Sequence, residues 1–180
     1  MDRREAVRLL GAIAAVPFLP RTAEAATGLA ARVHEAIQGG AHFRTFDPAQ
    51  QALVSHLANA IIPRTDTPGA LDVRVPEFID HVVTDWATEP ERRALLTGLA
   101  DVDARARSLG SATLAGLNAA GQAQLLAALD AERDSATGAG HAFGRIKSLA
   151  VYAYFTSEVV QRDVLQAQML FTAFEPCAPA

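Results

Sequence analysis

The amino-acid sequence predicts an all-α protein, a single domain of about five helices with short loops and an extended C-terminal tail. Apolar residues recur at helical spacing in several segments, and no stretch of useful length alternates apolar and polar residues. Helix-capping signals stand at the starts of these segments. Roughly 155 residues remain after a predicted leader, which is a usual length for one domain.

Each predicted helix begins at a recognisable capping signal. Asp47-Pro48 begins the first firm helix, Gln50 completes a variant of the capping box, and Pro63 ends the helix. The later helices are expected to begin near Val75-Pro76, at Thr88 with Glu91 in a Thr-x-x-Glu box, near Asn118 and near His141. Gly110 is expected just beyond the helix that begins at Thr88, where a left-handed residue commonly ends a helix.

The chain divides into four predicted segments. Residues 1–25 are a twin-arginine signal peptide, and 26–45 are either a short helix or a mobile leader. Residues 46–158 form the helical domain, and 159–180 form a C-terminal extension and tail. The last segment could begin as a helical continuation before it becomes extended.

The signal peptide is predicted from its three-part layout. Arg3 and Arg4 precede an apolar run from Leu9 to Leu19, and the small-residue segment 23–26 (Ala-Glu-Ala-Ala) provides an A-x-A-like cleavage site. The paired arginines favour the twin-arginine (Tat) route, as does the weakly apolar run with Arg21 after it. The alternative is an ordinary N-terminal helix with two solvated arginines.

Charge and cysteine content narrow the classes of partner. The formal net charge is −4 and no basic stripe is present, so nucleic acid is not an expected partner. The only long apolar run is the signal, which is too short to span a bilayer, so membrane contact is expected only through partners. Cys177 is the sole cysteine, which in an exported protein suggests a bond to another chain, a reactive thiol or an idle one.

No motif of an enzyme or a cofactor site is found in the sequence. It lacks a C-x-x-C-H haem attachment site, a G-x-G-x-x-G dinucleotide fingerprint, a cysteine cluster and a G-x-S-x-G nucleophile elbow. His81 and Asp85 lie four residues apart and could begin a metal site, but a solvated pair on a polar helix face is expected. The remaining histidines are expected to be exposed or structural: His34, His42, His56 and His141.

Two segments interrupt this regular helical pattern. The first is the turn-rich stretch Thr65–Ala70, and the second is Tyr154–Glu158 at a helix end. One interpretation is a recognition surface made of Asp66, Thr67, Tyr154, Phe155, Ser157 and Glu158. The alternative is that the two aromatic residues belong to the core, while Asp66 and Glu158 bond backbone amides to hold the loop and the helix end.

These segments also carry a resemblance to a known family. The run IIPRTDTPGALDVRVPEFID (Ile61–Asp80), the following Trp86, and YFTSE (Tyr154–Glu158) resemble the gluconate 2-dehydrogenase subunit 3 family. The N-terminal MDRREAVRLLGAIAAVP is similar to the twin-arginine leaders of that family. Departures begin after Glu158, because members often continue with Val-Gly-Ala and a tail ending in Gly-Cys, whereas here only Phe174–Cys177 echoes that tail.

The resemblance implies a non-catalytic small subunit of a periplasmic, membrane-associated dehydrogenase complex that oxidises a sugar or sugar acid. No cofactor is expected in this chain; FAD is expected in a flavoprotein large subunit and haem c in a multihaem cytochrome c subunit. Arg3 and Arg4 would engage the Tat translocase on behalf of the large subunit. The recognition surface, with Cys177 as a possible disulfide partner, would hold that subunit.

Two other classes of function stay open at this point. One is a stand-alone periplasmic enzyme with a metal site on His81 and Asp85. The other is a free-standing periplasmic binding or chaperone module.

Overall fold

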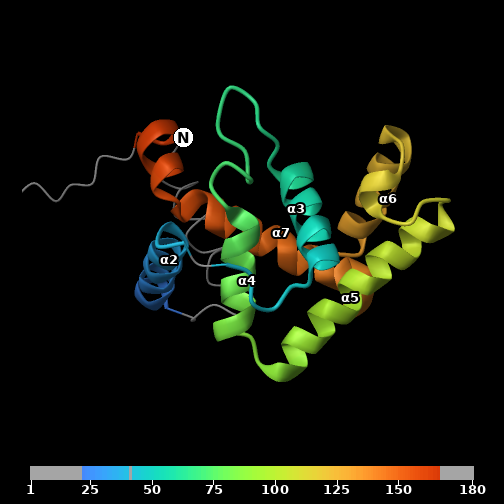
Figure 1. The fold of residues 1–180 in the computed structure, drawn as a ribbon, viewed down its shortest axis with the longest axis horizontal. Coiled ribbons are helices and arrows are strands. Elements are labelled where there is room, and N and C mark those ends of the chain that lie inside the picture. The colour runs from blue at the N-terminus through green and yellow to red at the C-terminus, as the bar shows by residue number, and fades with distance from the viewer. Residues whose placement is uncertain (1–21, 41, 167–180) are drawn as a thin grey trace, which may run out of the picture.

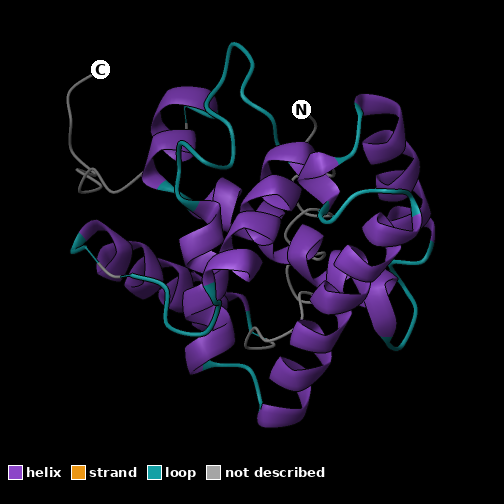
Figure 2. Ribbon diagram, turned by 45° about the vertical axis from the view of Figure 1, so that its right-hand side comes forward, coloured by secondary structure: helices purple, strands orange, loops and turns teal. Residues whose placement is uncertain are grey.

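The computed structural model describes residues 22–40 and 42–166, and every regular element in these residues is helical (Figure 1, Figure 2). The prediction of an all-α fold is confirmed. The predictions for Arg3, Arg4 and Cys177 concern residues outside the described part of the chain. The described elements are α2 (Ala23–Gln38), α3 (Pro48–Ile61), α4 (Val75–Asp85), α5 (Glu89–Ser108), the 3-10 turn η1 (Leu114–Gly116), α6 (Ala119–Ala131), α7 (Gly138–Thr156) and the π-helical turn η2 (Val160–Val164).

Helix α7 lies at the centre of the packing. It contacts each of the other five described α-helices, and Figure 1 shows it crossing the molecule behind α3 and α4. A helix with apolar residues around most of its circumference is buried in a protein core. This is the case for α7, whose buried side chains include Phe143, Ile146, Leu149, Ala150, Tyr152 and Ala153.

The helices begin at the capping signals that the sequence contains. The Asp47 side chain accepts from the Gln50 amide (2.9 Å), and Gln50 Oε1 accepts from the Asp47 amide (3.0 Å), so the predicted capping box is confirmed. The box of Thr88 and Glu91 is confirmed in the same way. Gly110 follows α5 with a φ of 90°, as expected for a residue that ends a helix.

Helix α7 begins earlier than the sequence suggested. It starts at Gly138, three residues before His141, and Thr137 occupies the N-cap position. Gly138 adopts a φ of 82°, which glycine tolerates without steric cost, so the Gly/Ala-rich stretch turns directly into the helix. The loop expected over 135–140 is therefore shorter.

Of the two alternatives for residues 26–45, the structure contains a helix, α2. Its apolar side chains Leu29, Val33 and Ile37 belong to the same core as α4 and α7. Both of its ends are held: the Tyr152 hydroxyl donates to the Ala26 carbonyl, and the Arg74 guanidinium donates to the Ile37 carbonyl. Burial raises the pKa of Tyr152 to about 12, so this hydroxyl keeps its proton and remains a donor.

Helices α5 and α7 meet at a point where only glycine fits. A Cβ at Gly98 would lie 2.6 Å from both the Ala142 Cβ and the Gly138 carbonyl oxygen. Neither neighbour can move freely, because both belong to the N-terminal half of α7. The close approach at Gly98 therefore fixes the distance between the two helices.

Replacing Gly98 with alanine is expected to lower the free energy of unfolding by about 1–3 kcal/mol, the usual cost of an extra methyl group in a filled interior. Gly28→Ala is the matched control, because a Cβ there has no neighbour within 4 Å and Gly28 lies inside α2. That variant is expected to stabilise the protein by up to about 1 kcal/mol through helix propensity. Urea unfolding of both variants tests this, and equal effects of the two would contradict it.

Candidate functional site

The loop between α3 and α4 projects from the helical body beside the C-terminal end of the fold (Figure 1, Figure 2). Its base is closed by a hydrogen bond from the Ala70 amide to the Ile62 carbonyl (2.9 Å). Gly69 packs so closely there that a Cβ would lie 2.6 Å from the Arg64 nitrogen. The chain therefore leaves and re-enters the core at nearly the same place, as in an Ω-loop.

Asp72 holds this loop in shape from its C-terminal side. One carboxylate oxygen accepts from the Gly69 amide (2.7 Å), and the other accepts from the Arg64 guanidinium (2.6 Å). At the tip, the Thr65 amide donates to the Thr67 carbonyl (3.1 Å). These bonds leave the side chains of Asp66 and Thr67 exposed at the end of a constrained turn.

Tyr154 of α7 joins the loop to the core. Its hydroxyl donates to the Pro68 carbonyl (2.8 Å) across a sequence separation of 86 residues, and the rest of its side chain is buried. The Phe155 ring lies edge-on against the Tyr154 ring, with centroids 5.4 Å apart. Contacts therefore run without a break from Phe155 through Tyr154 to Pro68.

Exposed apolar side chains accompany this junction. Leu71 in the loop is 47% exposed and Phe155 is 39% exposed. Leu71 lies three residues after Pro68, and Phe155 directly follows Tyr154, so each is next to the junction in sequence. We call the set of Asp66, Thr67, Leu71, Phe155 and Glu158 the loop–α7 surface.

The end of α7 is held by Ser157, which is buried. Its hydroxyl donates to the Tyr154 carbonyl (2.8 Å) and accepts from the Val160 amide (3.4 Å). Val160 is fully buried, so η2 turns back onto the core directly after the surface. Ser157 thus stabilises the backbone beside the loop–α7 surface, and its own side chain is not exposed.

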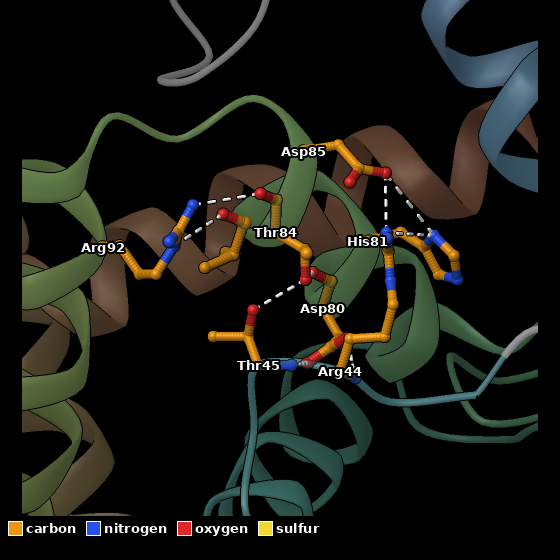
Figure 3. Close-up of polar contacts among 8 residues, drawn as sticks. Arg44, Thr45, Asp80, His81, Thr84, Asp85 and Arg92 are labelled. Carbon is orange, nitrogen blue, oxygen red and sulfur yellow. Dashed lines mark hydrogen bonds and ion pairs between the residues drawn. The ribbon is translucent and has the colours of Figure 1, made fainter.

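A second polar cluster lies where α4 meets the segment before α3 (Figure 3). The fully buried carboxylate of Asp80 accepts three backbone amides, from Arg44 (2.7 Å), Thr45 (3.0 Å) and Phe46 (2.8 Å). A buried carboxylate needs such donors to offset its lost hydration. Asp80 therefore fixes the chain entering α3 onto α4.

Arg44 occupies the space between His81 and Asp85. Its Nη2 donates to His81 Nδ1 (3.1 Å) and to Asp85 Oδ2 (2.6 Å), while Nδ1 and Oδ2 are 4.0 Å apart. A guanidinium can only donate, so Nδ1 must accept and the proton of the neutral ring lies on Nε2. Burial, and then the nearby Arg44 charge, lower the pKa of His81 and keep the ring neutral.

Arg92 of α5 completes this region by reaching the C-terminal end of α4. Its guanidinium donates to the carbonyls of Thr84 (3.0 Å) and Val83 (3.3 Å), as Figure 3 shows for Thr84. A cation at this end of a helix also interacts favourably with the helix dipole. The cluster thus joins α4 both to α5 and to the chain before α3.

The Arg44 guanidinium lies where a metal ion shared by His81 Nδ1 and Asp85 Oδ2 would have to bind. Asp85 is engaged by a guanidinium, and Asp80 is saturated by amides. Among residues 22–40 and 42–166 there is no group of three or more histidine, cysteine, aspartate or glutamate residues that could hold a metal ion. Nor is any helix in that part of the chain both long and apolar enough to cross a membrane.

Comparison with known proteins identifies the family. Residues 48–171 match the family described as gluconate 2-dehydrogenase subunit 3. The chain belongs to this family. Searches of curated proteins and of solved structures returned no match. The family match begins at Pro48, the first residue of α3, and it includes both halves of the loop–α7 surface.

Within this subunit 3 fold, the two sequence segments that carried the resemblance lie together. The loop and the end of α7 are joined by Tyr154, and the exposure of the side chains differs from residue to residue. Tyr154 is core, but Phe155 faces solvent. Asp66 bonds no described residue, and Glu158 pairs with Arg162 (3.4 Å), so neither holds a backbone amide as the alternative proposed.

The histidines of this subunit 3 protein also differ from expectation. The solvated pair predicted at His81 and Asp85 is wrong, because His81 is only 6% exposed and Arg44 bridges the two. His34 is half-buried, with Nε2 3.1 Å from the Thr156 hydroxyl and its ring against Phe78, whereas His42 is exposed as expected. His56 is also half-buried, and His141 donates from Nδ1 to the Ser135 carbonyl (2.8 Å).

Sequence reasoning did not find Asp72, Asp80, Arg44 or Arg92. Arg44 and Asp80 act on groups 34 to 41 positions away, so spacing contains no signal for them. Asp72 and Arg92 act over at most nine positions, but on backbone groups and an arginine side chain that no helical spacing marks. Asp80 was visible only as a charged residue in the apolar stripe Phe78–Val83 of α4. A carboxylate in such a stripe indicates buried amide donors nearby.

Stability is expected to fall as the pH drops below about 6.5, the ordinary pKa of histidine. Burial lowers the pKa of both His34 and His81 in the folded state, so the unfolded chain binds more protons there and gains stability relative to the native one. The loss begins near pH 6.5 and ends once the folded-state histidines are protonated. Its slope is at most about 1.4 kcal/mol per pH unit for each histidine.

Urea unfolding between about pH 5 and 8 measures this dependence, because carboxylates stay mostly ionised in that range. His81→Asn should reduce the slope even though it lowers stability overall. His42→Asn is the matched control, since His42 is exposed. An unchanged slope in His81→Asn would contradict the assignment of a neutral, buried His81.

Proposed function

We propose that this chain is the non-catalytic small subunit of a periplasmic, membrane-associated, FAD-dependent dehydrogenase complex of the gluconate type. It supplies the twin-arginine signal and an assembly surface for the flavoprotein large subunit. The observation that carries the proposal is the junction at Tyr154, which brings the two segments of family resemblance together in one exposed surface. The large subunit is the occupant proposed for that surface.

The composition of the loop–α7 surface supports this role. Stable protein interfaces have an apolar and aromatic centre with a polar rim. Phe155 and Leu71 supply exposed apolar area, and Asp66, Thr67 and Glu158 supply exposed polar groups. Because the bonds of Asp72, Tyr154 and Ser157 already hold the backbone in place, little conformational freedom is lost on binding.

Cofactor chemistry is assigned to the partners. FAD belongs to the large subunit and haem c to the multihaem cytochrome c subunit, which passes electrons to the respiratory chain. The complex is peripheral to the inner membrane on its periplasmic side, and this chain reaches the membrane through its partners. Cys177 is proposed as a disulfide partner of the large subunit.

The export role is tested by co-expressing the large subunit with either the native chain or an Arg3→Lys, Arg4→Lys double variant. The periplasmic amount of large subunit, measured by immunoblot and by FAD fluorescence, is expected to fall at least tenfold with the variant, because the paired arginines address the translocase. The charge is conserved, so general electrostatic effects are controlled. Equal periplasmic amounts with both chains would show that co-export is wrong.

The assembly surface is tested separately by Phe155→Ala. A central aromatic residue of an interface commonly contributes about 2 kcal/mol, so affinity for the purified large subunit is expected to fall about thirtyfold. Leu109→Ala is the matched control, because Leu109 is also an exposed apolar residue but lies at the end of α5. Binding is measured by surface plasmon resonance. If both variants bind as the native chain does, the large subunit uses another surface.

A further inference from the structure

The predicted signal cleavage site lies inside a folded helix. The A-x-A-like motif places the scissile bond between Ala25 and Ala26, in the first turn of α2. Thr22 is the N-cap of this helix, and its hydroxyl accepts from the Ala25 amide (3.3 Å). Its carbonyl accepts from the Ala26 amide (3.0 Å), which is the first hydrogen bond of the helix.

This turn is also docked onto the core. Ala26 is 2% exposed, and its carbonyl accepts from the buried Tyr152 hydroxyl of α7. Leu29 and Ala30 follow one turn later and are buried as well. The docking of α2 therefore begins at the residue that would become the new N-terminus.

A protease needs its substrate segment exposed and unfolded. Cleavage of a native protein usually tracks the population of locally opened molecules. To present the bond between Ala25 and Ala26, the first turn must unwind and Ala26 must leave the core. The Tyr152 hydroxyl then loses its acceptor while surrounded by apolar side chains, which is unfavourable.

We propose that docking of α2 protects the bond between Ala25 and Ala26 from signal peptidase. The leader then remains on the folded chain, and it is removed only from molecules in which the first turn of α2 has opened. This inference rests on the proposed function, since the twin-arginine route delivers the chain to the peptidase already folded. The stability of the first turn of α2 thus determines how often the leader is removed.

The test uses purified full-length chain and purified bacterial signal peptidase in detergent, with mass spectrometry of the product that begins at Ala26. Tyr152→Phe is expected to be cut about five- to tenfold faster, which corresponds to one lost hydrogen bond of about 1–1.4 kcal/mol. Gly28→Ala is expected to be cut up to about fivefold more slowly, because alanine stabilises α2 and its Cβ meets no neighbour.

Tyr154→Phe is the matched control, because it removes the other tyrosine hydroxyl of α7, which contacts Pro68 and not α2. Its rate should equal that of the native chain. A synthetic peptide of residues 15–32 contains the same bond without α7 and should be cut far faster than the folded protein.

Three results would overturn the proposal: a folded chain cut as fast as the peptide, a peptide that is not cut, or equal rates for Tyr152→Phe and Gly28→Ala. None of these results depends on export. If the large subunit is exported normally with the Arg3→Lys, Arg4→Lys variant, the export proposal fails. The peptidase rates still test whether α2 protects the cleavage site.

Discussion

The burial of α7 is the constraint on which the rest of the structure depends. A helix surrounded on most sides must satisfy every polar group that it carries through a neighbouring element. Tyr152 and Tyr154 do so in two directions, since one hydroxyl reaches the first turn of α2 and the other reaches the loop between α3 and α4. The first turn of α2 and the exposed loop are therefore both anchored to the same turn of one helix.

At α4, a buried charged side chain anchors a neighbouring segment in the same way. Asp80 gathers three consecutive amides of the chain before α3, and Arg44, positioned by that contact, bridges His81 and Asp85. His81 and Asp85, which could begin a metal site on their own, are thus both hydrogen-bonded to Arg44. This explains why a helix of mixed apolar and acidic character can be almost wholly internal, and why its histidine stays neutral.

Much of the fold could be predicted because its signals are local. Asp47 with Gln50, Thr88 with Glu91, and Gly110 each act within one helical turn, so their sequence spacing predicted the observed caps. The start of α7 was misplaced by three residues because Gly138 ends the loop with a left-handed conformation, which the sequence pattern does not distinguish from a longer glycine-rich loop. The sequence singled out both segments of the proposed binding surface, but it did not predict which of their side chains are exposed.

The sequence alone determined the helical class, the caps, the twin-arginine leader pattern and the family segments, since each of these is encoded in residues close together along the chain. Only the tertiary structure decided which side of each segment faces water. It buried Tyr154 and Ser157, exposed Phe155, and placed Ala26 of the predicted cleavage motif against Tyr152. These outcomes depend on contacts between residues up to 126 positions apart, and spacing within a segment contains no information about them.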